Sequence, residues 1–193
     1  MEAFTDGVMA IIITIMLLEL RPPGKADWSV LRKLLPVILT YVVSFIYVGI
    51  YWNNHHHLFQ VAEKVNGKVL WANLHLLFWL SLLPFVTGWV GHNHIATVPA
   101  ATYGFILFMC ATAWEILSRQ MLKLEGQGSR LAQAYRNDKK KILSIVLYLT
   151  GMGLSFVYVP AALMMYFIVA MLWLIPDRRF ERDFFLISIA RGR

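Results

Sequence analysis

The chain has 193 residues, of which 59% are hydrophobic, and its formal net charge is +7. A mean hydropathy of +0.59 is too high for a soluble domain of this length and indicates a membrane protein. In a membrane protein the charge of each loop is considered separately, so the positive total does not indicate a nucleic acid partner. The single cysteine, Cys110, excludes a disulfide or a cysteine-based metal site within one chain. No basic segment or small-residue cleavage site marks the N-terminus, so a signal peptide is not expected.

Apolar stretches long enough to cross a bilayer predict an all-α, polytopic membrane protein with six transmembrane helices in one domain, residues 1–193. The predicted spans are residues 3–20, 35–62, 68–90, 96–118, 140–158 and 160–176. Pro22-Pro23 ends the first span, and Pro36 falls in the first turn of the second. Asn66-Gly67 marks the turn into the third, and Leu83-Pro84-Phe85 predicts a kink within it.

The last two spans have an alternative, because residues 140–176 also fit one long bent helix. At 1.5 Å per residue, however, the stretch is too long for a single crossing of a core about 30 Å thick. Gly151, Gly153 and Pro160 also lie where a tight hairpin needs them. Two spans are therefore favoured.

The distribution of lysine and arginine supports this topology. If the N-terminus is cytoplasmic, the three inner loops hold two, seven and five of the 18 basic residues. The first outer connector, residues 24–34 with its flanks, holds the other four. Inner loops carry the excess of positive charge in membrane proteins, so both termini are predicted to be cytoplasmic.

The first span carries two faces. At 100° per residue, Ile11, Thr14, Ile15 and Leu18 share a stripe about 100° wide, and Asp6 falls on the far side. A stripe of this kind ordinarily faces lipid or a protein core. Asp6 indicates a functional or structural role beyond packing, because an ionisable side chain at membrane depth costs free energy unless it is paired or hydrated. The alternative is a helix N-cap at the interface, formed by Thr5 or by Asp6 itself.

Partners for that acid are found on the second and third spans. Trp52, His55, His56 and Phe59 are spaced to share one helix face, which offers an indole N–H and two imidazoles. Asn73 lies at a similar depth on the third span, so a buried polar cluster is predicted. Consecutive histidines lie 100° apart, and no His-x-x-x-His pair is present, so no metal site is expected.

The segment Phe4-Thr5-Asp6-Gly7, followed by Ala10 to Thr14, resembles the first helix of the transmembrane protein 175 family of potassium channels. The Trp52 to Phe59 face, Asn73 and Leu83-Pro84-Phe85 resemble the second and third helices of that family. The resemblance covers about the first 90 residues, and the remainder only by its six-span layout. Threonine replaces the family's serine at position 5, and the family's arginine would fall just before Met1.

The resemblance implies a homotetramer in which the first helix of each chain lines a central pore. Ile11 would form the hydrophobic constriction with Ile15 and Leu18 below it, and Thr14 with Ile11 would govern selectivity. The implied structural network comprises Phe4, Thr5, Asp6, Trp52, His55, His56 and Asn73.

The predicted function is a potassium-preferring leak channel of the cell membrane with a hydrophobic gate, with potassium ions, the lipid bilayer and its own copies as partners and no cofactor. No hydrolase, P-loop or dithiol motif suggests an enzyme. The main alternative is a proton pathway or secondary transporter that uses Asp6 and the histidines. The remaining alternatives are a metalloenzyme that uses the histidines and a scaffold without catalytic activity.

Overall fold

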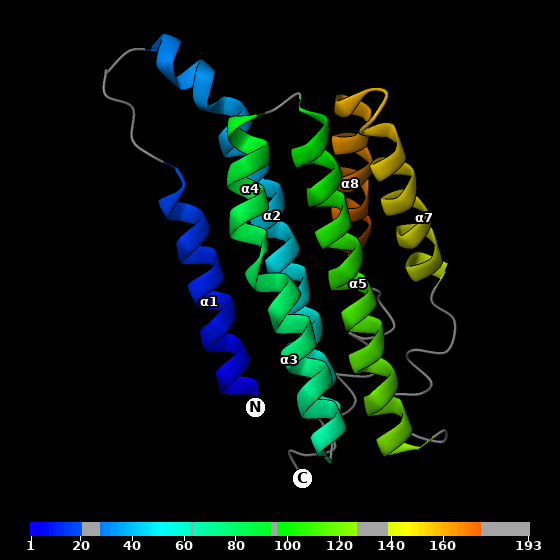
Figure 1. The fold of residues 1–193 in the computed structure, drawn as a ribbon. Coiled ribbons are helices and arrows are strands. Elements are labelled where there is room, and N and C mark those ends of the chain that lie inside the picture. The colour runs from blue at the N-terminus through cyan, green and yellow to red at the C-terminus, as the bar shows by residue number, and fades with distance from the viewer. Residues whose placement is uncertain (21–27, 63, 94–95, 127–138, 175–193) are drawn as a thin grey trace.

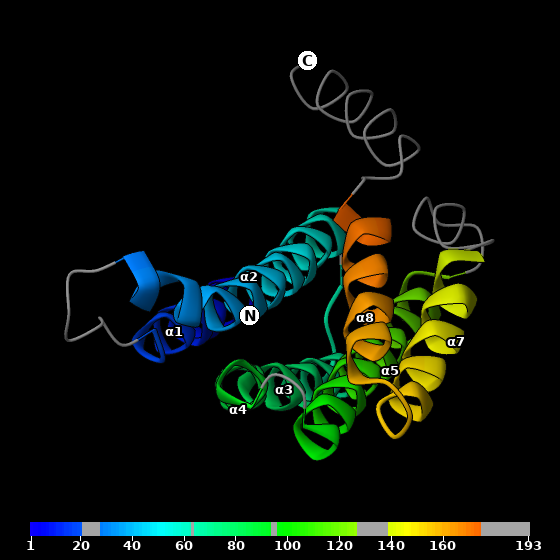
Figure 2. The same cartoon turned by 90° about the horizontal axis from the view of Figure 1, so that it is seen from above.

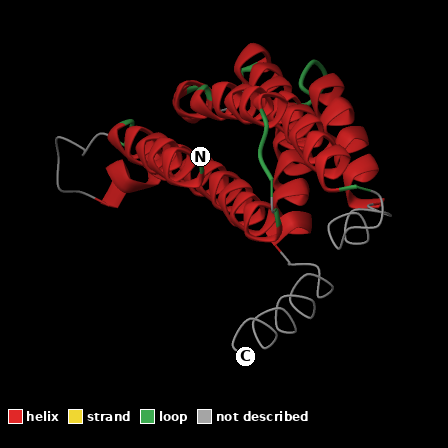
Figure 3. Cartoon of the chain, turned by 90° about the horizontal axis from the view of Figure 1, so that it is seen from below, coloured by secondary structure: helices red, strands yellow, loops and turns green. Residues whose placement is uncertain are grey.

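The computed structural model describes residues 1–20, 28–62, 64–93, 96–126 and 139–174. All the regular structure in these ranges is α-helical, as Figure 3 shows. The helices are α1 Glu2–Leu18, α2 Trp28–Val61, α3 Gly67–Ser81, α4 Leu83–His92, α5 Thr97–Glu125, α7 Lys139–Leu154 and α8 Val159–Leu174. Figure 1 shows them running roughly side by side, with α1 at one edge and α7 at the other.

Within these described ranges, three stretches are long and apolar enough to cross a membrane, namely Leu31–Gln60, Gly67–His92 and Thr97–Glu125. Val159–Leu174 is a shorter apolar helix. Both findings agree with the prediction of an all-α, multi-pass membrane protein. Three features used in the sequence analysis lie outside the described residues. They are the double proline after α1, part of the first connector, and most of the basic residues of the last two inner loops.

The second helix begins earlier than the sequence suggested. It starts at Trp28, so Pro36 lies inside the helix and the prediction that it occupies the first turn is wrong. Residues 28–34 continue the helix because an interior proline removes only one backbone hydrogen bond and kinks the helix instead of ending it. Figure 1 shows the first turns of α2 inclined to the rest.

The third predicted span is divided into two helices. Asn66 caps α3, accepting a hydrogen bond from Val69 N at 3.0 Å on its side-chain oxygen. The helix ends at Ser81, and α4 begins at Leu83 with Pro84 in its first turn. The kink predicted at Leu83-Pro84-Phe85 is therefore present.

The last two described helices form the hairpin that the sequence favoured, and Figure 2 shows α7 and α8 side by side next to α5. The buried ring of Tyr166 on α8 fills the space where α5 and α7 have only glycine. A Cβ on Gly104 would overlap the Tyr166 hydroxyl, and a Cβ on Gly151 would lie 2.5 Å from Tyr166 Cε1. These two glycines let three helices approach one tyrosine closely.

A chain of buried hydroxyls crosses the core between α4, α2 and α5. Thr87 Oγ1 donates to Ser44 Oγ at 2.7 Å, and Ser44 Oγ lies 2.8 Å from Tyr103 Oη. Beside it, the Tyr47 hydroxyl donates to the Tyr166 carbonyl at 2.5 Å. Polar groups inside an apolar core are stable only when they are bonded in this way, and these bonds fix how the helices meet.

Candidate functional site

The first helix contacts the rest of the chain along one face only. Thr5, Met9, Ile12 and Met16 are buried against α2, α3 and α4. Their spacing of three or four residues is that of a single helical stripe. A helix that packs along one stripe leaves the opposite side of its surface without a partner in the same chain.

That opposite side holds the residues singled out in the sequence. Ile11 is 58% exposed, Ile15 44% and Leu18 77%, and Thr14 is exposed between them. The Thr14 hydroxyl donates to the Ile11 carbonyl at 2.9 Å. Its proton is therefore used within the helix, and its oxygen lone pairs remain able to accept from, or coordinate, something outside it.

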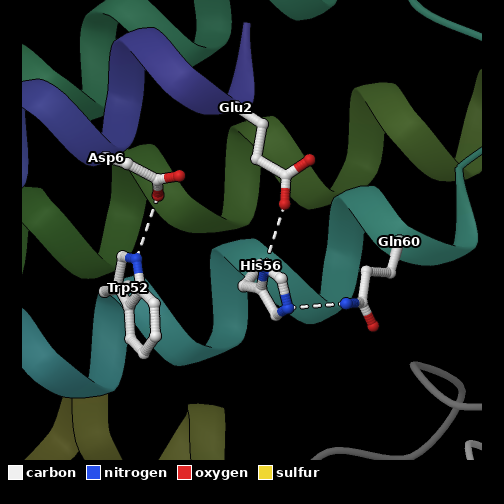
Figure 4. Close-up of polar contacts among 5 residues, drawn as sticks. All are labelled: Glu2, Asp6, Trp52, His56 and Gln60. Atoms are coloured by element: carbon white, nitrogen blue, oxygen red, sulfur yellow. Dashed lines mark hydrogen bonds and ion pairs between the residues drawn. The ribbon is translucent and has the colours of Figure 1, made fainter.

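Two carboxylates at the start of α1 bind α2 (Figure 4). Asp6 Oδ1 accepts from Trp52 Nε1 at 2.9 Å, and Glu2 Oε1 lies 2.9 Å from His56 Nδ1. Gln60 Nε2 lies 2.6 Å from His56 Nε2, and an amide nitrogen donates, so a neutral His56 carries its proton on Nδ1 and donates it to Glu2. The Trp52 and His56 rings are stacked with centroids 5.9 Å apart.

A second, fully buried set connects α1 to α3 and α2. Asn73 Nδ2 donates to Thr5 Oγ1 at 2.9 Å, and Asn73 Oδ1 accepts from His55 Nε2 at 3.0 Å. All three side chains are almost completely shielded from solvent, and Asn73 is only 1% exposed. His55 also packs on Phe59, with ring centroids 4.4 Å apart. Asn73, on α3, thus bonds to both α1 and α2.

The structure divides the single polar cluster that the sequence predicted into these two sets. Thr5, His55 and Asn73 lie together in one, Asp6, Trp52 and His56 in the other, and Phe4 points outward with 58% exposure. The N-cap interpretation of Thr5 and Asp6 is wrong, because the helix begins at Glu2 with Met1 as its cap.

Two members of the set around His56 were missed from the sequence, Glu2 and Gln60. Glu2 lies four residues before Asp6, and Gln60 four residues after His56. Side chains four residues apart share a helix face, so this spacing could have revealed both.

Within the described residues, no group of three or more histidine, cysteine or acidic side chains is placed to hold a metal ion. Two histidines of α2 instead bond to side chains: His56 to the Glu2 carboxylate and the Gln60 carboxamide, and His55 to the Asn73 carboxamide. The arrangement serves to hold helices together.

A family model described as endosomal/lysosomal potassium channel TMEM175 matches residues 1–84, which include all of α1, α2 and α3. A potassium channel of Chryseobacterium sp. (strain P1-3) is 54% identical over 183 residues, covering 95% of this chain and 95% of that one. The endosomal/lysosomal proton channel TMEM175 of Rattus norvegicus is 31% identical over 119 residues, which is 58% of this chain and 23% of the rat protein.

The fold is similar to a solved one as well. The crystal structure of a lysosomal potassium-selective channel TMEM175 homolog from Chamaesiphon minutus superposes with a TM-score of 0.76 at 27% identity, covering 89% of this chain and 93% of that one. These relatives are ion channels and not enzymes. Identity above one half along nearly the whole length of a relative confirms the resemblance carried by the first three spans: the chain belongs to the TMEM175 family.

Proposed function

We propose that this protein is a potassium-preferring leak channel, built as a homotetramer in which four copies of α1 line a central pore. The observation that supports it is the division of α1 into a packed face and an exposed face that carries Ile11, Thr14, Ile15 and Leu18. Relatives named as potassium channels support the choice of ion. One helix per chain cannot enclose a pore, so several copies are required.

In this assembly four Ile11 side chains form an apolar ring that closes by expelling water, which is a recognised gating device. Potassium releases its hydration shell more readily than sodium at such a ring. Thr14 lies almost one turn further along the same face, and its oxygen is available because its proton is donated to the Ile11 carbonyl. Four Thr14 oxygens then replace part of the lost shell. Without a cage of backbone carbonyls, the preference for potassium is modest.

The proposed topology places the channel in the cell membrane with both termini in the cytoplasm. The support is the positive-inside distribution of the 18 lysines and arginines. In this orientation the carboxylates of Glu2 and Asp6 lie at the inner end of the pore helix, and Leu18 lies toward the outer end.

The test is the reversal potential under opposed potassium and sodium gradients, measured on the full chain reconstituted in liposomes. Ile11→Ala and Ile11→Asn should raise the current severalfold and move the reversal potential toward the non-selective value, because the apolar ring is widened or hydrated. Leu17→Ala is the matched control, since Leu17 is 52% exposed on α1, close to the 58% of Ile11, but lies off the stripe, and it should behave as wild type. Wild-type conductance and selectivity in both Ile11 variants would remove Ile11 as the constriction.

The second candidate function is a proton pathway. It is favoured by the rat relative, which is named a proton channel, and by the titratable pair of Glu2 and His56 beside Asp6 on the first two helices. Acidification of liposomes loaded with a pH-sensitive dye, under a potassium diffusion potential, measures it directly. Proton entry that Asp6→Asn and His56→Gln abolish, with potassium current unchanged, would establish this second activity.

A further inference from the structure

A cavity of about 300 Å³ lies between α2, α5, α7 and α8, on the side of α2 away from α1. Most of its wall is apolar, and large aromatic side chains supply much of it. These are Tyr47, Tyr51, Trp114, Tyr148 and Trp173. The walls are held in place, because Tyr51 and Trp114 meet edge to face and the Trp173 indole donates to Ser144 Oγ at 2.8 Å. Its volume is at the lower end of the range for small-molecule sites, about 300–1,000 Å³.

Three charged side chains also line the cavity. Glu115 on α5 reaches two cations, with Oε1 2.7 Å from Arg119 Nε and Oε2 3.0 Å from Lys141 Nζ. One carboxylate faces two positive groups, so this part of the lining is net positive. The Arg119 side chain is 69% exposed, which leaves the rest of its guanidinium group open to a further anionic partner.

These charges lie toward one end of the molecule, where α5 finishes and α7 begins. Lys123 on α5 and Lys140 on α7 add further positive charge there. In the proposed topology this is the cytoplasmic side. Anionic lipids are concentrated in that leaflet, and basic pockets between membrane helices bind their head groups.

We propose that this cavity binds an anionic phospholipid, with one acyl chain between the aromatic walls and the phosphate at Arg119 and Lys141. A soluble anion would leave the apolar walls unused. A zwitterionic lipid has the same phosphate but brings its own cation to a site that is already net positive, so its attraction is weaker. The site has a consequence for α1, because Ile50, Tyr51 and Asn54 line the cavity while Trp52 and His56 on the same helix hold α1. A bound lipid therefore supports the helix on which α1 is anchored.

The inference depends on membrane embedding and is independent of which ion the protein conducts. It is tested by native mass spectrometry of the full chain in detergent, titrated with phosphatidylglycerol and with phosphatidylcholine of the same acyl chains. Phosphatidylglycerol should be retained more tightly. Arg119→Gln should weaken its binding about fivefold, the loss expected for one basic residue near an anionic lipid. In this variant Glu115 keeps its ion pair with Lys141.

Two further variants locate the lipid. Lys123→Gln removes an exposed charge on the same helix, outside the cavity lining, and should change phosphatidylglycerol binding by less than twofold. Ala111→Phe fills the cavity without altering any charge and should abolish the tight binding. Helicity and gel-filtration profiles establish that each variant folds. If Ala111→Phe does not fold, the comparison of phosphatidylglycerol binding by Arg119→Gln and Lys123→Gln still tests the proposal.

Three results would overturn the proposal. Equal retention of the two lipids would show that the head-group charge is not recognised. Equal weakening by Arg119→Gln and Lys123→Gln would mean diffuse attraction to a basic surface. Unchanged binding in a folded Ala111→Phe variant would place the lipid outside the cavity.

Discussion

Asn73 satisfies two partners at once, and this makes the buried polar set sensitive to single atoms. Its amide nitrogen donates to Thr5 and its amide oxygen accepts from His55, with all three side chains out of solvent. Removing one partner of a buried hydrogen bond leaves the other unsatisfied, which costs about 1–3 kcal/mol. The set therefore tolerates changes of shape better than the loss of a polar group.

Thr5→Val preserves the shape of the side chain and removes its hydroxyl, so Asn73 Nδ2 loses its acceptor. We expect the variant to unfold several degrees below wild type in detergent, measured by the change of intrinsic fluorescence on heating. Thr5→Ser keeps the hydroxyl and is the matched control, with a midpoint near that of wild type. A Thr5→Val protein as stable as Thr5→Ser would show that the Asn73 bond contributes nothing to stability.

At the residue scale, the sequence predicts most of the polar partners, without Glu2 and Gln60, but only part of their pairing. The acid on α1 and the indole on α2 were expected to meet, and Asp6 bonds to Trp52. The sequence could not predict that His55 would turn to Asn73 while His56 turned to Glu2, because adjacent residues on a helix differ by 100° and the neighbouring helix decides which partner each meets.

Among the helices, the close approach of α5, α7 and α8 depends on positions without a side chain. Gly151 on α7 faces the Tyr166 ring, whereas nothing lies within 4 Å of a Cβ built on Gly153 of the same helix. Two glycines only two residues apart thus have different roles. One admits a neighbouring ring, and the other faces open space.

Gly151→Ala should destabilise the α7–α8 hairpin by about 1–3 kcal/mol, the usual cost of overpacking, because the aromatic ring has to move. Gly153→Ala meets no such obstacle and should be neutral or stabilising by up to about 1 kcal/mol, since alanine is the better helix former. Thermal unfolding of the two variants in the same detergent measures the difference. Equal midpoints would show that Tyr166 moves aside without cost.

Most helices were predictable, and their ends were the weaker part. Apolar runs and turn residues located the spans, and Asn66 and Pro84 lie where helices begin. Two ends were extended, since α2 starts at Trp28 and α5 continues to Glu125. The apolar pattern marks where a helix enters a hydrophobic environment, but a helix can continue past that boundary into polar surroundings without a change in backbone geometry.

For the whole molecule, the tetramer remains a proposal that distances between copies can test. In the proposed pore the four Leu18 side chains approach one another, so Leu18→Cys should form cross-linked dimers under mild oxidation, as seen on a non-reducing gel. Cys110 is buried, which keeps the wild-type background low. Val157→Cys, 84% exposed in the turn between α7 and α8, is the control and should remain monomeric on the gel. The opposite pattern would place α1 away from the axis.

The sequence carried less information at this scale than at the others. The exposed stripe on α1 shows that a surface lacks a partner, but a surface of this kind meets lipid or another copy with similar apolar side chains. The number of copies and their symmetry depend on contacts between chains, which no periodicity within one chain encodes.

The bonding of α1 has a mechanical consequence. Its strong side-chain hydrogen bonds gather in residues 2–6. Further along the helix Met9, Ile12 and Met16 pack mainly through apolar contacts, supplemented by a weak hydrogen bond from Thr87 Oγ1 to Met16 Sδ at 3.9 Å. A helix held in this way pivots about its bonded end. At 1.5 Å per residue, Ile11 lies about 9 Å from Thr5 and Leu18 about 20 Å. A rigid tilt therefore displaces Leu18 about twice as far as Ile11. In the proposed pore, the Ile11 ring is then disturbed less than the Leu18 ring by loose packing at the far end of α1.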